Sequence, residues 1–191
     1  NLIPRPETEE LVEWILSSSI IHHPSYILDI GTGTGCIPIS LKTNLPKANV
    51  SAIDVSEKAL EVAKRNAISN KVDISFIQAN ILEVEDLSQY FDIIVSNPPY
   101  VRNLEKEEIK KNVLDYEPHL ALFVEDTDAL LFYRKIAQLA LKNLAPNGLL
   151  FFEINQYLGK ETVELLENLG FKNIELKKDM YGNERMIRCT I

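Results

Sequence analysis

Residues 26–35 read Tyr-Ile-Leu-Asp-Ile-Gly-Thr-Gly-Thr-Gly, an apolar run followed at once by three glycines at alternate positions. The apolar run predicts a buried strand, and the glycines predict a tight turn into a helix. A strand, a glycine-rich turn and a helix in this order open a nucleotide-binding βαβ unit. The spacing is G-x-G-x-G, which differs from the G-x-G-x-x-G of dinucleotide-binding enzymes.

An acidic residue follows the glycines at about the distance expected in a nucleotide-binding βαβ unit. Asp54 follows Gly33 by 21 residues and ends the next apolar run. A carboxylate at this point can accept hydrogen bonds from the hydroxyls of a ribose. The glycines alone are weak evidence, because they also allow close packing of a helix on a strand. Asp54 also has a simpler interpretation, as the residue that leads into a helix capped by Ser56.

A second motif, Asn97-Pro98-Pro99-Tyr100, ends a later apolar run at residues 91–96. The two prolines remove two backbone donors and fix φ near −65°, and each disfavours helical backbone in the residue before it. The strand therefore ends in a rigid, extended turn. The Asn97 side-chain oxygen and the backbone carbonyls of the turn are acceptors, and Tyr100 adds an aromatic face. Together they suit a planar group that bears an NH2.

Strands and helices alternate along the rest of the chain. Helical spacing predicts helices at 7–20, 35–44, 56–69, 128–144 and 159–169. Strands are expected at 26–30, 49–54, 74–78, 91–96, 149–154, 171–178 and 185–191. The turn between the last two strands is too short for a parallel crossover, so these strands should be antiparallel. The sequence predicts one α/β domain over residues 1–191, with a seven-stranded, mostly parallel sheet whose last strand is antiparallel.

Composition excludes several classes of protein. The 20 basic and 28 acidic residues give a formal charge of −8 with no long basic block, which argues against tight binding to a nucleic-acid backbone. No apolar run approaches the ~18 residues of a transmembrane helix, and no secretory signal is visible. Cys36 and Cys189 are too few and too far apart for a metal knuckle. We expect a cytoplasmic protein with no metal and no membrane partner.

The leader Asn1-Leu2-Ile3-Pro4-Arg5-Pro6-Glu7-Thr8-Glu9 carries a more specific resemblance. Together with residues 29–35 and 97–100, it resembles the protein-glutamine N5-methyltransferases that act on peptide chain release factors. Glu117-Pro118, Ala121-Leu122, Lys178-Asp179, Gly182 and Arg185 also fall where that family has them. The match spans the whole chain. It implies a Rossmann-like class I methyltransferase fold, S-adenosylmethionine as cofactor and a release factor as protein substrate.

The resemblance also implies roles for particular residues. Catalysis is expected from Asn97, Pro98, Pro99 and Tyr100. The cofactor is expected to contact Gly31, Thr32, Gly33, Gly35, Asp54, Val55, Asn80, Ile81, Asn97, Arg5, Pro6 and Thr8. Asn80 departs from the family, which usually has an acidic residue there, and Asn155 replaces a usual glycine. The family's small helical domain, which precedes the leader, is expected to be absent here, and the chain is expected to be a monomer.

Three alternatives stay open at this stage. A sister group methylates a glutamine of a ribosomal protein with the same core motifs. DNA adenine methyltransferases share Asn-Pro-Pro-Tyr and use it on an exocyclic amine, but such enzymes must also extrude the base and grip the backbone. The third alternative is a scaffold that keeps the fold without activity.

Overall fold

The computed structural model describes residues 6–18, 25–99, 101–102, 123–124 and 128–191. A seven-stranded sheet lies at the centre, with strand order β3-β2-β1-β4-β7-β9-β8. Its strands are β1 (Tyr26–Ile30), β2 (Asn49–Asp54), β3 (Ser75–Gln78), β4 (Phe91–Ser96), β7 (Leu144–Glu153), β8 (Lys172–Lys178) and β9 (Glu184–Thr190). Two short strands, β5 (Val101–Arg102) and β6 (Phe123–Val124), pair with each other outside this sheet. The predicted α/β class is confirmed.

Pairing directions also agree with the prediction. β1, β2, β3, β4 and β7 are parallel, whereas β9 is antiparallel to both β7 and β8. β9 therefore inserts between β7 and β8 and runs against every other strand of the sheet. Because β9 starts at the edge where β7 ends, the β8–β9 turn lies at the same edge as the carboxyl ends of the parallel strands.

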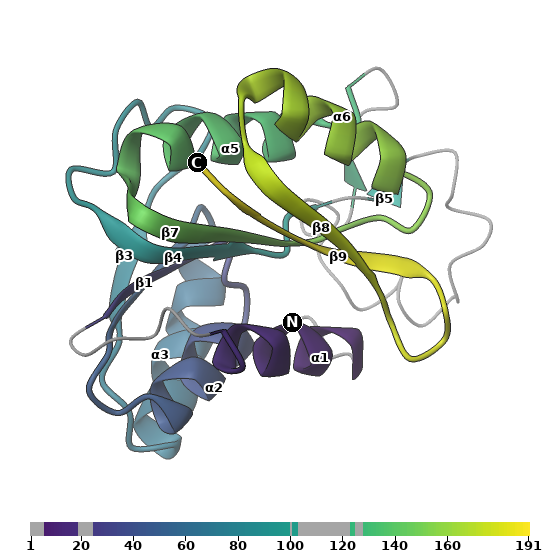
Figure 1. Cartoon of the computed structure of the whole chain (residues 1–191). Coiled ribbons are helices and arrows are strands. Elements are labelled where there is room, and N and C mark those ends of the chain that lie inside the picture. Colours follow the sequence, from purple (N-terminus) through teal and green to yellow (C-terminus); the bar gives the residue numbers. More distant parts are fainter. Residues whose placement is uncertain (1–5, 19–24, 100, 103–122, 125–127) are drawn as a thin grey trace.

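Helices cover both faces of the sheet (Figure 1). One face carries α1 (Pro6–Leu16), α2 (Cys36–Asn44) and α3 (Glu57–Ser69), and the other carries α5 (Leu131–Asn143) and α6 (Gly159–Leu169). Two apolar clusters fill the layers: one joins Trp14, Ile27 and Phe151 on the α1–α2 face, and the other joins Leu28, Tyr133 and Phe152 on the α5–α6 face. The strands of such a three-layer domain are apolar on both sides, as their sequences are.

Local signals explain several element ends. The Ser56 side chain accepts a hydrogen bond from the Ala59 N–H at 3.2 Å and caps α3, as predicted. Gly170 ends α6 in the left-handed region with φ +94°, the usual role of a glycine at this place. Pro38 is the third residue of α2, where it costs no helical hydrogen bond.

The region before β7 differs from the prediction. The predicted helix 128–144 begins at Leu131 and ends at Asn143, and β7 begins at Leu144 instead of near Leu149. Leu144 pairs with Phe91 and Leu149 with Ile93, so residues 145–148 form a bulge in the ladder. Asn147 takes φ +65° inside that bulge. The sequence shows this segment as a Pro-Asn-Gly turn, and only pairing with β4 makes it part of the strand.

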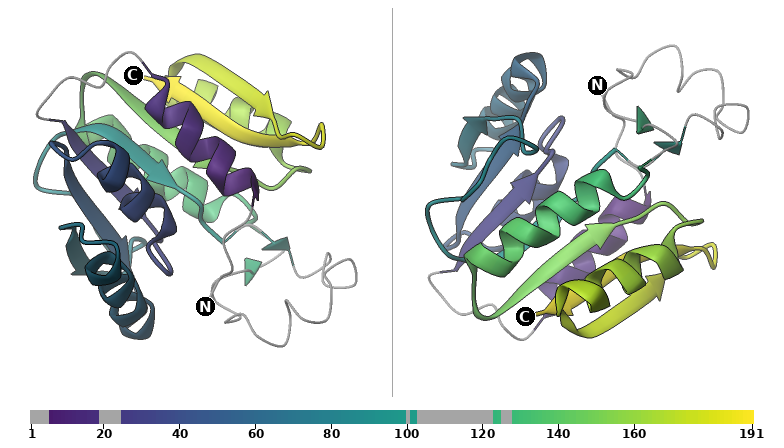
Figure 2. Two further views of the ribbon diagram at one scale, coloured as in Figure 1. Left: turned by 90° about the horizontal axis from the view of Figure 1, so that it is seen from below. Right: turned by 90° about the horizontal axis from the view of Figure 1, so that it is seen from above.

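The carboxyl ends of the parallel strands meet at one edge of the molecule, on the right in Figure 1. Figure 2 shows β5 and β6 beyond this edge, outside the layered body. Ligands of open α/β sheets bind at the carboxyl ends of the strands, so this edge is where a site is expected. Among the described residues, no helix is both long enough and apolar enough to cross a membrane.

Candidate active site

The glycine-rich turn after β1 is fixed by the neighbouring strand. The N–H groups of Gly31 and Thr32 both donate to the Ile53 carbonyl, at 2.8 and 3.0 Å. Gly31, Gly33 and Gly35 all have positive φ, at +77°, +55° and +82°, a region that residues with a side chain rarely adopt. The backbone conformation of this turn therefore requires glycine at these three alternate positions.

Gly35 has a second reason to be glycine. A Cβ at this position would lie 3.0 Å from the Cβ of Ala63 on α3 and 3.2 Å from Cδ1 of Ile39. α3 thus packs directly on the start of α2. The Asn66 side chain of α3 donates to the Thr34 carbonyl at 2.9 Å and holds the two helices at this point.

Asp54 shapes the same turn from the end of β2. One carboxylate oxygen accepts the Gly33 N–H and the other accepts the Ser56 N–H, both at 2.8 Å. Asp54 therefore joins the glycine turn to the start of α3, which combines the two interpretations of its position in the sequence. Each carboxylate oxygen has a further lone pair, so these contacts leave Asp54 able to accept from a ligand hydroxyl.

Asp29 is a buried carboxylate beneath this turn. It is fully inaccessible, and neither of its oxygens, nor the buried Thr32 hydroxyl, has a hydrogen-bond partner among the residues that the structure describes. Burial raises the pKa of Asp29 to about 7; the Thr32 hydroxyl near it lowers the pKa, and the charge of Asp54 raises it. A buried polar group without a partner is costly, so this pair is poised for a ligand that brings a donor or a positive charge.

The Asn97 turn lies against the glycine turn. The Ser96 hydroxyl donates to the Ile30 carbonyl at 2.6 Å, which ties the ends of β4 and β1 together. The Asn97 backbone oxygen lies 4.0 Å from the position of a Cβ on Gly31. The Asn97 side chain is half-buried and makes no hydrogen bond to any residue in the described part of the chain. Its amide is therefore available to a ligand at the edge of the sheet.

The structure adds Glu153, which the sequence analysis did not select. Glu153 ends β7, is fully buried and accepts a hydrogen bond from the Thr8 hydroxyl of α1 at 2.7 Å. Ser96 pairs with Phe152, so Glu153 is on the strand beside the one that leads to Asn97. Its sequence signal is the same as that of Asp54, an acidic residue at the end of an apolar strand.

Other predicted site residues have different surroundings. The Asn80 amide makes local hydrogen bonds, donating to Glu83 Oε1 at 2.8 Å and accepting from Leu82 N at 3.2 Å. The Ile81 side chain is buried in the core, whereas Val55 is exposed. Pro98 is buried and Pro99 half-buried. Pro6 and Thr8 lie in the first turns of α1, and Arg5 and Tyr100 lie outside the described residues. Contacts of all these residues with a cofactor stay predictions.

A glycine turn, a strand-end carboxylate and an amide without a described partner lie at one edge of the sheet, as in an enzyme that binds a nucleoside-containing cofactor. Comparison with known proteins shows that this enzyme is a methyltransferase. The family model of the methyltransferase small domain matches residues 9–119. The release factor glutamine methyltransferase of Flavobacterium psychrophilum is 70% identical over 100% of this chain and 68% of its own length. The protein of that name from Bacteroides thetaiotaomicron is 46% identical over 99% of this chain and 68% of its own length.

Solved structures agree on the fold. The hMettl16 catalytic domain, in complex with a MAT2A 3′UTR hairpin, superposes with a TM-score of 0.75 at 19% identity, over 100% of this chain and 71% of that one. The ribosomal protein L11 methylase of Lactobacillus delbrueckii superposes with a TM-score of 0.65 at 22% identity, over 97% and 78%. The chain belongs to the release factor glutamine methyltransferase family, and its cofactor is S-adenosylmethionine.

The residues present fit this cofactor. S-adenosylmethionine carries an adenosine, a positively charged sulfur and an amino-acid end with an ammonium group. The buried, unpartnered Asp29 carboxylate suits a cationic group, and Asp54 suits a ribose. The positive φ of Gly31 and Gly33 lets the backbone run close to a ligand without side chains in the way.

Proposed function

We propose that this protein transfers a methyl group to the side-chain amide nitrogen of a glutamine in a peptide chain release factor. The observation that carries the proposal is the free Asn97 amide beside the glycine turn. The relatives' names support the same substrate. Release factors act on cytoplasmic ribosomes, so we also propose a cytoplasmic location. Asn97, Asp29 and Asp54 come from one chain, so a monomer can carry the whole site.

An amide nitrogen is a poor nucleophile, because its lone pair is delocalised into the carbonyl. When bound, the cofactor supplies an activated methyl group. The protein must then hold the amide and favour charge on its nitrogen. We assign one N–H of the target amide to the Asn97 side-chain oxygen and the other to the Pro98 carbonyl. Both acceptors bind more strongly as positive charge develops on the nitrogen, which is the condition for catalysis.

Rigidity at Asn97 supports this role. The prolines fix the backbone after it, and the Ser96 hydroxyl anchors the strand end before it. An acceptor that is already in place costs little reorganisation in the transition state. No strong base is needed, since a methylated amide nitrogen is very acidic and loses its proton readily to water. We propose that Tyr100 packs on the plane of the amide.

The test uses purified release factor, S-adenosylmethionine and the protein, followed by mass spectrometry of proteolytic peptides. The expected result is one added methyl group on one glutamine. Parallel reactions contain purified ribosomal proteins and duplex DNA. Methylation of a ribosomal protein or of a base amine, with an unmodified release factor, would overturn the proposal in favour of the other substrate.

A further inference from the structure

The β8–β9 turn presents two large apolar side chains to solvent. Met180 is 67% exposed and Tyr181 is 66% exposed. The turn lies at the carboxyl edge of the sheet, because β9 pairs antiparallel with β7, with Glu153 opposite Met186. Figure 1 shows the turn at the edge that bears the candidate active site. The two side chains are therefore displayed on the face that a protein substrate must approach.

Hydrogen bonds of Asp179 and Arg185 fix the conformation of the β8–β9 turn. Asp179 is buried, and its carboxylate accepts from the N–H groups of Tyr181 and Asn183, each at 2.9 Å, and from Arg185 Nε at 3.3 Å. Arg185 also donates to the Ile154 carbonyl at 3.3 Å, which joins the turn to the end of β7. A preformed turn loses little conformational entropy when a partner binds.

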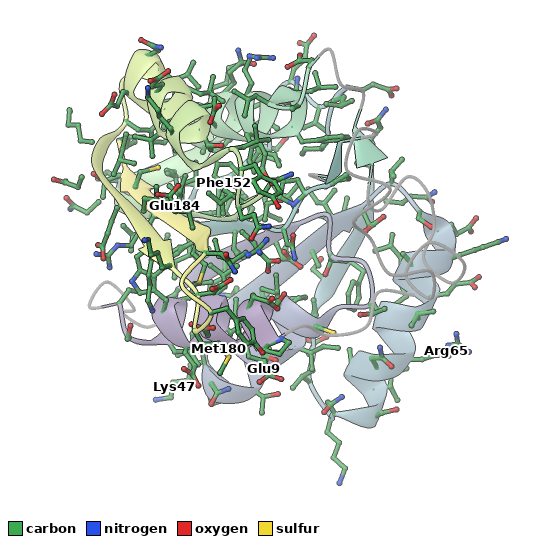
Figure 3. All side chains as sticks on the ribbon, turned by 90° about the vertical axis from the view of Figure 1, so that its right-hand side faces the viewer. Glu9, Lys47, Arg65, Phe152, Met180 and Glu184 are labelled. Atoms are coloured by element: carbon green, nitrogen blue, oxygen red, sulfur yellow. The ribbon has the colours of Figure 1, made fainter. Side chains whose placement is uncertain are left out.

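The neighbouring helix gives this surface its charge. The Met180 N–H donates to Glu10 Oε1 of α1 at 3.0 Å. α1 contains Glu7, Glu9, Glu10 and Glu13 and no basic residue, and Figure 3 shows Met180 on the side where Glu9 lies. The hairpin also carries basic side chains: Lys178 is exposed, and Lys177 and Arg188 lie over the Trp14 ring farther along α1, at 5.3 and 5.2 Å. Beside Met180, the contact is with the glutamates in the first turns of α1. The surface has an apolar tip, with the glutamates of α1 beside it.

We propose that Met180 and Tyr181, with the acidic side chains of α1, form the docking surface for the protein that carries the target glutamine. The partner segment has an apolar side chain flanked by Lys or Arg. The inference rests on the proposed function: Asn97 can recognise only an amide, so the choice of one glutamine among many requires contacts outside the site. Exposed aromatic and methionine side chains are the types enriched in interfaces.

The experiment compares steady-state methylation of purified release factor by the full-length enzyme and by the double variant Met180→Ala/Tyr181→Ala. The expected result is a KM for the release factor raised about tenfold or more, a kcat within about twofold and an unchanged Kd for S-adenosylmethionine. Glu9→Lys/Glu13→Lys should also raise KM, and the effect should shrink at high salt. Tyr181→Phe should keep the wild-type KM, because the ring remains.

The matched control is Tyr90→Ala. Tyr90 is 67% exposed and directly precedes β4, at the opposite edge of the sheet. Its loss should leave KM unchanged. An unchanged KM in the double variant, with wild-type enzyme methylating the release factor, would overturn the inference alone. A wild-type enzyme inactive on the release factor would overturn the proposed function with it. A dimer in sedimentation that the double variant converts to monomer would show that a second copy covers this surface and would also overturn the inference.

Discussion

At the scale of single residues, two polar side chains near the strand ends have unused hydrogen-bonding capacity. Asn97 has a half-buried amide with no hydrogen bond to a described residue, whereas Asp29 is fully buried with no hydrogen-bond partner among those residues. A buried polar group without a hydrogen-bond partner lowers the stability of the fold. Such groups are therefore expected where a ligand supplies the missing hydrogen bond. We propose that the two residues supply the two halves of a transfer site, an amide acceptor and a place for a cation.

Asn97→Ala should remove most turnover. The loss of one preorganised acceptor in a transition state costs on the order of 10²–10³ in rate, and the Asn97 side chain makes no hydrogen bond to a described residue that its removal would break. Steady-state methylation of release factor measures kcat, and calorimetry with S-adenosylmethionine should give a near-normal Kd. Near-full activity in this variant would contradict the proposed grip on the amide. Asn97→Asp should not restore turnover, because an added charge disturbs the orientation of the target.

The raised pKa of Asp29 predicts how the stability of the protein depends on pH. Its pKa is about 7 in the folded protein and 3.8 when unperturbed, so between these values the folded state holds a proton that the unfolded state has lost. Stability of the cofactor-free protein should therefore fall as pH rises from about 4 to 7 and then level off. Asp29→Asn removes this penalty. Urea unfolding should show the variant more stable than wild type at pH 8, with a smaller difference at pH 5.

The control for the pH experiment is Asp73→Asn, which changes an exposed carboxylate away from the site. It should shift stability little and equally at both pH values. If Asp29→Asn gave the same stability difference at pH 5 and pH 8, the burial argument for Asp29 would be wrong.

At the scale of elements, glycines and strand ends bring the site together. The glycine turn could be predicted from the sequence because its signals are local: three glycines in five residues, and Asp54 at the end of the following strand. Glu153 has the same local signal as Asp54, but its contact with Thr8 could not be predicted, because the two residues are 145 positions apart in the chain. The Met180–Glu10 contact spans 170 positions for the same reason. The bulge at residues 145–148 also escaped prediction, since only the β4 register reveals it.

Gly35→Ala should destabilise the protein more than Gly170→Ala does. Both glycines have positive φ, at +82° and +94°, so both variants bear a similar backbone strain of about 1–2 kcal/mol. Only Gly35 is also crowded, with Ala63 Cβ 3.0 Å from the new Cβ, whereas nothing lies within 4 Å at Gly170. The overpacking should add about 1–3 kcal/mol. Urea unfolding of the two variants measures the difference, and equal losses would contradict the close α2–α3 packing.

The contact between α1 and β7 can be measured by a double-mutant cycle. Thr8→Val removes the donor and Glu153→Leu removes the acceptor of the 2.7 Å hydrogen bond. A bond to a carboxylate in a buried place should give a coupling free energy of about 1–3 kcal/mol in unfolding experiments. Additive single effects would mean that Glu153 is held by other contacts and that Thr8 does not anchor α1.

At the scale of the whole molecule, the chain is acidic, and part of this charge lies on α1 beside the candidate site. The formal charge is −8, and α1 concentrates four glutamates beside the edge that bears Asn97. The fold is shared with an hMettl16 domain solved with an RNA hairpin at 19% identity, which shows that this architecture alone does not choose a substrate. We propose that the charge of this surface and the residues at the carboxyl edge of the sheet determine the substrate. The sequence gives the net charge, and only the fold shows where the acidic helix lies.

The last prediction links the site to global stability. A ligand that binds only the folded state at a concentration of 100 times its Kd adds about 2.7 kcal/mol, which for a domain of this size raises Tm by roughly 5–11 °C. S-adenosylmethionine at that concentration should therefore raise the Tm of wild type and of Asn97→Ala equally, since Asn97 is assigned to the substrate. Asp54→Ala should lose roughly 1.5–3 kcal/mol of cofactor binding, so its rise in Tm at the same concentration should be half of the wild-type value or less. Its cofactor-free Tm should also be lower, because Asp54 holds the Gly33 and Ser56 N–H groups, and only the rise on adding cofactor reports binding. Equal rises in wild type and Asp54→Ala would separate Asp54 from the cofactor and leave it the purely structural role of joining the glycine turn to α3.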